Sequence, residues 1–483
     1  MRYFLGVTAI ALACSLGLAQ QAPPQAAAPA PATAPLAGQA PAAAPTSQPP
    51  AAPAAKPRPA PKNNFLLQNV RLIDGRGGPA RDHVSILIKN GKIAQIVSGS
   101  AITLNDPDVE KLDLKGKTVM PGLINGHGHL GLTRAGRFST AAFTEDTISS
   151  QLFHYQQYGV TTMISLGLNK DLLYQLRARQ EKGEYAGATI LTADRGIGVP
   201  NGVPQLPVEA DQIYRPTTPE EARKDVDEMA SRAPNLIKVW VDDSLHKAPT
   251  PSPAVYAAAI DEAHKQKLRV AAHVYYLADA KRLIQDGVDI LAHSIRDQEV
   301  DADTISLLKA KKIYYIPTLQ LEESFYIYAE NPAWLDTPFF AGSINLGLFR
   351  ILASAEYKKQ VLDDPATPIH RAALQTAMVN LKKLKEGGVL VAFGTDSGAN
   401  PYRISGWAEH RELQLMVSAG MTPLEAIHSA TDVNAKMLQI EEKTGTVVVT
   451  KQADLLVLNE DPTTEIANTE KIAMVFHNGV RVR

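Results

Sequence analysis

Short apolar runs alternate with longer segments of helical pattern over most of the chain. Runs of valine, isoleucine, leucine and alanine without a polar face are typical of parallel strands that are buried on both sides. Eight such runs occur, at residues 119–130, 159–165, 188–191, 236–240, 269–273, 290–293, 313–317 and 391–396. Strands that alternate with helices predict βα units and a parallel sheet. We therefore predict the α/β fold class, with a (β/α)8 TIM barrel over residues 119–444.

Segments with helical periodicity lie between several of these runs. The helix candidates are residues 219–233, 253–267, 278–286, 303–310 and 373–386. Two further segments, 192–214 and 319–367, are longer than ordinary loops. The first is rich in glycine and proline, and the second is rich in aromatic residues. Long connections of this kind often carry function, so we expect both segments to act as lid and substrate-contact elements.

Residues 63–118 and 445–483 carry a different pattern, in which apolar and polar positions alternate over short stretches. Turn signals such as Asp74-Gly75, Asn90-Gly91 and Asn478-Gly479 separate these stretches. The alternation is typical of strands that bury one face. We expect the two segments to pair and to form a small β-sandwich domain beside the barrel.

Residues 1–20 have the pattern of a secretory signal peptide, with Arg2 followed by an apolar stretch and small residues. This stretch is too short for a comfortable membrane span. The only cysteine, Cys14, lies inside it, and the apolar run continues to Leu18, which favours ordinary cleavage after Cys14. A lipid anchor at Cys14 is the alternative. Residues 21–62, dominated by alanine, proline and glutamine, are expected to be a disordered linker. We therefore expect an exported, periplasmic protein, with attachment to the membrane by lipid as the alternative.

The composition limits the class of partner. A chain of 483 residues that is 45% hydrophobic can form one large domain with a sizeable core and a smaller accessory domain. The formal net charge is -1 and there is no long basic run, so the usual electrostatic footprint of nucleic-acid binding is absent. We expect a small-molecule or dipeptide substrate and no nucleic-acid partner. A homo-oligomer is expected because barrel enzymes often assemble, although no stretch identifies an interface.

Side chains suited to a metal site come at or near the ends of several apolar runs. His127 and His129 belong to the first run, and side chains alternate with period two along a strand, so both can reach one metal ion. Glycine at positions 126 and 128 is expected to keep side-chain bulk out of that approach. The later candidates are Lys238, His273, His293 and Asp396. In a parallel barrel the carboxyl ends of the strands form one face, where active sites are built.

These motifs resemble the amidohydrolase superfamily of metal-dependent hydrolases. The resemblance covers residues 64–483 and depends on Pro-Gly-Leu-Ile-x-x-His-x-His at 121–129 and Gly-Thr-Asp-Ser at 394–397, together with the strand-four lysine and the later histidines. The superfamily usually has aspartate at the supporting position that Asn125 occupies here. By pattern the chain is most similar to prolidase-like (Xaa-Pro dipeptidase-like) and imidazolonepropionase-related hydrolases. The resemblance implies a metal-dependent amidohydrolase that acts on C–N bonds.

Within this superfamily a lysine at the end of strand four marks the two-metal branch, in which CO2 carboxylates the amine and the carbamate bridges both ions. Lys238 fits that position. The resemblance implies two divalent metal ions, one held by His127, His129 and Asp396 and the other by His273 and His293, with Lys238 between them. Zinc is the default metal for these ligands, and manganese, cobalt and iron are alternatives. The alternative is that Lys238 binds no metal and instead forms an ion pair with Asp242 or Asp243.

The resemblance also implies catalytic roles for two residues. Asp396 would carry a proton from the bridging hydroxide to the leaving amine. Tyr275, in the His-x-Tyr sequence at 273–275, would contact the substrate near the scissile carbonyl, although a packed aromatic side chain fits the same pattern. His410 is a weaker pocket candidate. The histidines expected to be structural or exposed are His83, His264, His428 and His477.

The predicted function is hydrolysis of an amide or peptide bond, in a dipeptide or an N-acyl amino acid, by a hydroxide that bridges two metal ions. A single-metal cyclic amide (imidazolone) hydrolase or a deaminase is the first alternative, and Lys238 argues against it. A two-metal ester, lactone or organophosphate hydrolase would use the same ligands. A binding protein that has lost catalysis would have lost at least one ligand, and none is missing.

Overall fold

The computed structural model describes residues 62–99, 102 and 104–483. The predicted signal peptide, Cys14 and all but the last residue of the predicted linker lie outside the described residues. Within the described part, no helix is both long enough and apolar enough to cross a membrane.

Eight parallel strands form two arcs, ordered β10-β9-β6 and β11-β12-β13-β14-β15. Their bounds are β6 Leu123–Gly128, β9 Val160–Ser165, β10 Thr189–Thr192, β11 Ile237–Trp240, β12 Val270–His273, β13 Ile290–Ala292, β14 Tyr314–Ile316 and β15 Leu390–Val391. One isolated parallel bridge joins the arcs at each border, Gly128 with Ser397 and Ile197 with Val239. All eight predicted strands are therefore present, in the order of a TIM-barrel-type α/β fold.

Helices connect most of these strands and bury their apolar faces against them. Val226 and Met229 of α3, for example, share one core with Val239 of β11. The helices of this part are α1 Glu145–Gln157, α2 Leu172–Glu181, α3 Pro219–Ser231, α4 Pro253–Lys265, α5 Leu277–Gln285, α6 Ala302–Ala310, α11 Thr367–Glu386, α12 Trp407–Ser418, α13 Pro423–His428 and α14 Asn434–Met437. The five predicted helices are confirmed as α3 to α6 and α11.

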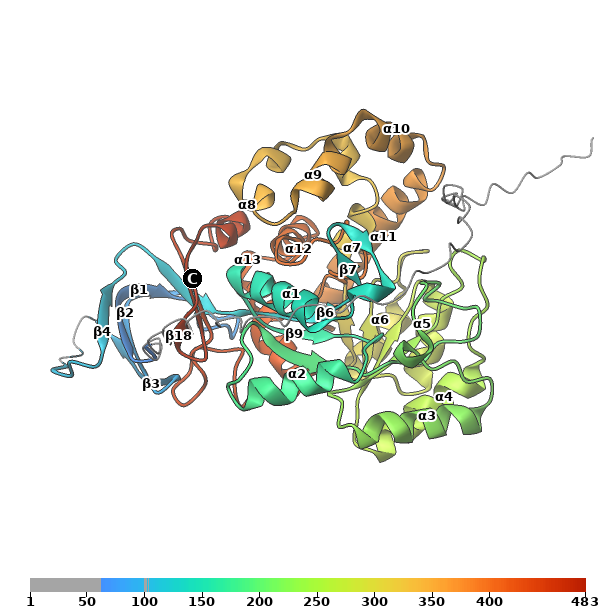
Figure 1. Cartoon of the computed structure of the whole chain (residues 1–483), viewed down its shortest axis with the longest axis horizontal. Coiled ribbons are helices and arrows are strands. Elements are labelled where there is room, and N and C mark those ends of the chain that lie inside the picture. Colours follow the sequence, from blue (N-terminus) through green and yellow to red (C-terminus); the bar gives the residue numbers. More distant parts are fainter. Residues whose placement is uncertain (1–61, 100–101, 103) are drawn as a thin grey trace, which may run out of the picture. The chain divides into compact units, whose positions relative to one another are not determined.

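Both ends of the described chain join one eight-stranded sheet, ordered β18-β17-β16-β5-β1-β2-β3, with β4 paired to β1. Its strands are β1 Phe65–Leu72, β2 Arg81–Lys89, β3 Lys92–Ser98, β4 Glu110–Asp113, β5 Thr118–Pro121, β16 Leu455–Leu458, β17 Ile472–His477 and β18 Val480–Arg481. In Figure 1 the first strands, in blue, and the last, in dark red, gather on one side. The predicted pairing of the two ends is confirmed by the antiparallel ladder between β5 and β16. A two-layer sandwich stays a prediction.

Residues 319–367 fold into short helical pieces rather than an extended loop. The pieces are α7 Leu319–Glu323, η3 Ile327–Glu330, η4 Ala333–Asp336, α8 Pro338–Ala341, α9 Leu346–Ala353 and α10 Ala355–Asp363. Their aromatic residues explain why the segment folds: Trp334 packs on Trp407 of α12 with ring centroids 4.5 Å apart, and Phe340 lies 5.1 Å from the same ring. The segment is therefore attached to the helix that follows the last barrel strand.

The glycines of β6 have a different purpose from the predicted one. Side chains at 126 and 128 face away from His127 and His129, because neighbouring residues of a strand point to opposite faces. A Cβ at Gly126 would lie 2.6 Å from Met437 Cε and 2.7 Å from the carbonyl oxygen of Phe393. A Cβ at Gly128 would lie 3.1 Å from the hydroxyl of Tyr155. These glycines make room for core packing behind the strand, and not for the approach of a metal.

We expect Gly126→Ala to lower the free energy of unfolding by about 1–3 kcal/mol, because the new methyl group would overlap a backbone oxygen that cannot move cheaply. Gly78→Ala is the matched control, since a Cβ there meets nothing within 4 Å. Urea unfolding followed by circular dichroism measures both variants. Equal stability of the two variants would contradict this account of β6.

Candidate metal centre

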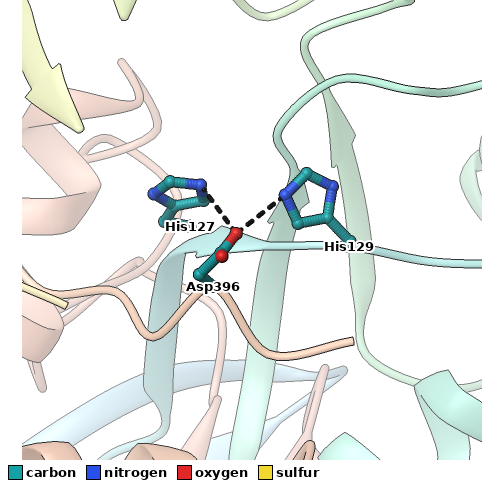
Figure 2. Close-up of side chains that lie close together, drawn as sticks. All are labelled: His127, His129 and Asp396. Carbon is teal, nitrogen blue, oxygen red and sulfur yellow. Dashed lines mark ion pairs between the residues drawn. The ribbon is translucent and has the colours of Figure 1, made fainter. Parts of the chain in front are cut away.

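Two histidines and one aspartate meet where β6 and β15 end. His127 lies in β6, His129 directly follows it, and Asp396 comes shortly after β15. The Nε2 atoms of His127 and His129 lie 3.2 Å and 3.0 Å from the same carboxylate oxygen, Oδ1 of Asp396. All three side chains are buried, and Figure 2 shows both rings directed at that oxygen. The period-two spacing of the histidines thus produces one shared cluster.

Asp396 reaches this position through an unusual backbone conformation. Its φ is 56°, in the left-handed region that residues other than glycine rarely adopt. Such a residue costs about 1–3 kcal/mol and persists only where its surroundings hold it. Here the amide of Asp396 donates to the carbonyl of His127 at 2.7 Å, and the amide of Thr395 donates to the same oxygen at 3.1 Å. The strained turn therefore binds the eighth strand to the first.

The electrostatics of the cluster favour a neutral imidazole at His127 beside an ionised carboxylate at Asp396. Burial and the nearby charge of Lys238 lower the pKa of His127 to about 3. Burial would raise the pKa of Asp396, but the charge of Arg403 and the hydrogen bonds from the two histidines hold it well below its ordinary value. A neutral imidazole carries a lone pair, and an ionised carboxylate carries a charge, so His127 and Asp396 are in the form that binds a cation.

Lys238 is a buried lysine in the middle of β11, only 1% exposed. Burial lowers the pKa of its amine to about 7. Asp242 and Asp243, its alternative partners, are engaged elsewhere: Asp242 with His273 at 2.6 Å and Asp243 with Tyr276 at 2.8 Å. Among the described residues neither aspartate forms an ion pair with Lys238. The alternative that Lys238 serves only as the ion-pair partner of one of these aspartates is therefore not supported.

His273 and His293 form a second group beside the first. Their ring centroids lie 4.4 Å apart, and the ring of His293 lies 4.5 Å from that of His127. Nε2 of His273 donates to Asp242, and Nδ1 of His293 lies 2.8 Å from the hydroxyl of Thr318. A carboxylate or hydroxyl on the outer nitrogen is what orients histidine ligands in metal sites. The other ring nitrogens have no hydrogen-bond partner among the described residues.

The sequence interpretation missed the role of Asp242, which it considered only as a partner of Lys238. Burial would raise the pKa of Asp242, but the hydrogen bond from His273 and the charge of Arg296 bring it down to about 2. The signal was present in the sequence, because residue 242 lies in phase with residues 238 and 240 along the strand direction. An ionised Asp242 fixes the orientation of the His273 ring.

The donor set fits divalent metal ions. Two ligand atoms bonded to one zinc ion at about 2.0–2.1 Å in a tetrahedron lie about 3.3 Å apart. The distances of 3.0 Å and 3.2 Å between the histidine nitrogens and Asp396 match that spacing. Imidazole nitrogens with one carboxylate are also the ligands that zinc and its neighbours in the first transition row prefer.

A buried network behind the centre explains why Asn125 replaces the usual aspartate. Asn125 Nδ2 donates to Oε1 of Glu409 at 2.7 Å, and Asn125 Oδ1 accepts from the amide of His127 at 2.9 Å. Glu409 also accepts from the hydroxyls of Thr395 and Ser397, each at 2.7 Å. This carboxylate therefore binds both the His-x-His strand and the turn that carries Asp396. Because Glu409 is itself an acceptor, its partner at position 125 must be a donor.

Tyr275 follows His273 by two residues and is half-buried. Its ring packs over the guanidinium of Arg296 at 4.5 Å, and Arg296 Nε donates to the buried Glu322 at 2.6 Å. Burial raises the pKa of the Tyr275 hydroxyl, which stays protonated and can donate. Its hydroxyl has no hydrogen-bond partner among the described residues. The position agrees with the predicted substrate contact without testing it.

His410 does not face the centre. Its Nδ1 lies 3.0 Å from the hydroxyl of Thr469, and its Nε2 lies 2.8 Å from the carbonyl of Tyr158, so both nitrogens serve packing in the core. The other histidines set aside from the sequence also lie away from the cluster, and His264, for example, pairs with Asp289 on the barrel exterior.

A cavity of about 490 Å³ lies beside Arg403, and none of the six candidate ligands lines it. Arg403, which lines it, also donates from Nη1 to Oδ2 of Asp396. The cavity is bounded by the hairpin of β7 (Thr133–Arg134) and β8 (Arg137–Phe138), by α1 and by residues 342–348 of the aromatic segment. Residues 342–348 belong to the segment 319–367, whose contact with a substrate stays a prediction. Arg403 was not predicted, because nothing in its sequence context marks it.

The fold and this site can now be compared with those of known proteins. Residues 118–482 match the model of the amidohydrolase family, so the chain belongs to that family. The resemblance seen in the motifs is thereby confirmed.

Three relatives illustrate the family. An uncharacterised protein of Mycobacterium tuberculosis is 28% identical over 270 residues, which are 53% of this chain and 63% of that protein. Ochratoxinase from Aspergillus niger is 30% identical over 269 residues, which are 53% of this chain and 48% of that enzyme. The match thus spans less than two thirds of either relative. A candidate prolidase from Bifidobacterium longum, a solved structure, is 27% identical with a TM-score of 0.67, covering 87% of this chain and 95% of that one.

Asn125 and Glu409 should behave as a coupled pair. Asn125→Asp would place two carboxylates about 2.7 Å apart in the core, and we expect it to lower the free energy of unfolding by about 2–4 kcal/mol. Adding Glu409→Gln restores a donor and acceptor pair, so the double variant should regain most of that loss. Urea unfolding of the two single variants and the double variant measures the coupling. Strictly additive losses would contradict the arrangement.

Proposed function

We propose that this protein is a metal-dependent amidohydrolase that cleaves the amide or peptide C–N bond of a small substrate, a dipeptide or an N-acyl amino acid. His127, His129 and Asp396 would hold one divalent ion, His273 and His293 a second, and Lys238, carboxylated by CO2, would lie between them. The observation that carries the proposal is the buried Lys238. Its charge lowers the pKa values of His127, His273 and His293, which means that the amine lies close to both groups of ligands.

Two bound zinc ions would lower the pKa of a shared water and stabilise negative charge on the carbonyl oxygen of the substrate. The proton transfer and the hydrogen bond to the substrate come from side chains of the protein. Asp396, ionised, accepts a proton from the attacking water and passes it to the leaving nitrogen. The hydroxyl of Tyr275 donates toward the scissile carbonyl. Water adds to the carbonyl carbon, the C–N bond breaks, and a carboxylic acid and an amine are released.

The relatives support an amide substrate. The Bifidobacterium longum structure is that of a candidate prolidase, and the Aspergillus niger relative is named ochratoxinase. A segment of 85 residues is also 39% identical to an N-substituted formamide deformylase of Arthrobacter pascens. The retention of all six candidate ligands argues against a protein that only binds.

Metal content tests the two-ion assignment. We expect elemental analysis to find close to two equivalents per chain in the wild type, and one or fewer in Lys238→Ala, with at least a 100-fold loss of activity on dipeptides and N-acyl amino acids. Lys265→Ala, which removes an exposed lysine of α4, is the control and should keep both. One equivalent in wild type and in Lys238→Ala would make Lys238 structural and favour a single-metal imidazolone hydrolase or deaminase. An ester and a lactone belong in the panel, because preferential cleavage of either would reassign the substrate.

Reconstitution should depend on CO2 and on pH. Only a neutral amine adds to CO2, and with a pKa of about 7 the amine of Lys238 is largely neutral at pH 8 and largely protonated at pH 6. At constant dissolved CO2, we expect metal-free protein given Zn²⁺ to regain activity about tenfold faster at pH 8 than at pH 6. Lys238→Glu supplies a carboxylate without CO2 and should lose this dependence. Recovery in wild type at a rate unaffected by CO2 would count against the carbamate.

A further inference from the structure

One arginine contacts the backbone directly after both histidines of the second group. Nη1 of Arg296 donates to the carbonyl oxygen of Val274 at 3.0 Å and to that of Ser294 at 2.8 Å. Each carbonyl belongs to the residue that follows a candidate ligand, His273 in one case and His293 in the other. A terminal guanidinium nitrogen carries two hydrogens, so it can serve both carbonyls at once. The side chain of Arg296 thus joins the two segments that carry these histidines.

This junction lies beyond the end of the backbone ladder between β12 and β13. Within the described residues, the last pair of that ladder is Ala272 with Leu291. Beyond it the regular ladder hydrogen bonds no longer fix the spacing of the two strands. The guanidinium supplies two hydrogen bonds there, and the amide of Arg296 adds a third by donating to the carbonyl of Tyr275 at 3.0 Å. Arg296 therefore extends the connection between the strands past the histidines.

The guanidinium is itself held by a buried ion pair. The side chains of Arg296 and Glu322 are 6% and 5% exposed, and Nε of Arg296 donates to Oε1 of Glu322 at 2.6 Å. The other oxygen of Glu322 lies 2.7 Å from Nδ1 of His370. Burial would raise the pKa of Glu322, but the charge of Arg296 and the hydrogen bond from His370 hold it below its ordinary value. Charge-assisted hydrogen bonds are directional, so the pair fixes the guanidinium opposite the two carbonyls.

The contacts of this guanidinium are confined to the second group. Besides the two carbonyls and Glu322, its central carbon lies 4.5 Å from the ring centroid of Tyr275, two residues after His273. In the part of the chain that the structure describes, its side chain forms no hydrogen bond with the first group, which consists of His127, His129 and Asp396. Loss of the guanidinium should therefore act on one group of ligands and not on the other.

We propose that Arg296 is a positioning residue for the second metal ion, because it holds the ends of β12 and β13 at the separation that lets His273 and His293 bind one ion. The ring centroids of these histidines lie 4.4 Å apart. Contacts behind metal ligands commonly change metal affinity by about 10–100-fold. The proposal rests on the two-ion assignment of the proposed function and adds a residue that controls one ion selectively.

The neighbouring glutamate of α7 provides a matched control. Glu323 is also buried, and it accepts from Nε of Arg411 at 2.8 Å and from Nη2 at 2.5 Å. The remaining side-chain hydrogen bond of Arg411, among the described residues, goes to Gln414 and not to the backbone beside a candidate ligand. Arg296 and Arg411 thus both pair with α7, and only Arg296 binds the two carbonyls.

Titration of metal-free protein with Co²⁺ in bicarbonate buffer tests the proposal without turnover. Arg296→Lys keeps the charge beside Glu322 but loses the planar fork that reaches both carbonyls. We expect wild type and Arg411→Lys to bind two equivalents with similar affinities. Arg296→Lys should bind the first equivalent within threefold of wild type and the second about 10–100-fold more weakly. The visible absorption of the second Co²⁺ should change in Arg296→Lys alone, because it reports the geometry of the ligands.

Three results would overturn the proposal. They are an unchanged second ion in Arg296→Lys, an equal weakening of both ions, and the same loss in Arg411→Lys, which would assign the effect to displacement of α7. Circular dichroism of each metal-free variant checks that it folds. If Arg296→Lys does not fold, the double variant Arg296→Met with Glu322→Leu takes its place under the same criteria, since it leaves neither charge buried without a partner.

Hydrolysis is measured separately, so this proposal and the proposed function can fail independently. If wild type binds two ions but cleaves no dipeptide or N-acyl amino acid, the proposed function fails. A selective loss of the second ion in Arg296→Lys would still support the positioning role. If wild type binds only one ion, the positioning role is overturned, and cleavage of the same substrates would then keep amide hydrolysis with a single metal.

Discussion

The carboxylate of Asp396 is the point at which the buried charges of this protein meet. One oxygen lies against the Nε2 atoms of His127 and His129, and the other accepts a hydrogen bond from Arg403. A buried carboxylate is stable only when paired and hydrogen-bonded, so it requires these three cationic or polar partners around it. Every element that supplies a partner is thereby constrained: the first barrel strand, the turn after the last strand, and the loop before α12.

The backbone is strained at Asp396, the residue that carries this carboxylate. The left-handed turn at Asp396 is stabilised by amide hydrogen bonds to the carbonyl of His127, and by the hydroxyls of Thr395 and Ser397 that bind Glu409. Because Glu409 also binds Asn125, the same carboxylate fixes both sides of the cluster. Strain of this kind is typical of functional sites, where surrounding contacts over-determine the geometry.

The candidate ligands and the cavity lie on different parts of the fold. Parallel strands bring the candidate ligands to one face because all their carboxyl ends point the same way. The cavity is lined by a short hairpin, α1, the loop after β15 and residues 342–348. Arg403 links the two regions, since its Nη1 donates to Asp396 and its residue also lines the cavity.

Hydrophobic periodicity alone determined the eight strands, the five helices and the pairing of the two chain ends, because burial on one face or two imposes a period that is visible in the sequence. Period two and parallel strands predicted that the candidate side chains share one face, whereas their assignment as one ligand set came from the family resemblance; the structure brings His127, His129 and Asp396 together. The sequence interpretation misjudged Gly126 and Gly128 and gave no sign of Arg403, and it left Asp242 with the wrong partner. Those features depend on contacts between residues distant in the chain, such as Gly126 with Met437 and Asn125 with Glu409. Only the packing of distant segments against one another and the conformation of single loop residues, such as the left-handed Asp396, decide them, and neither leaves a periodic signal in the sequence.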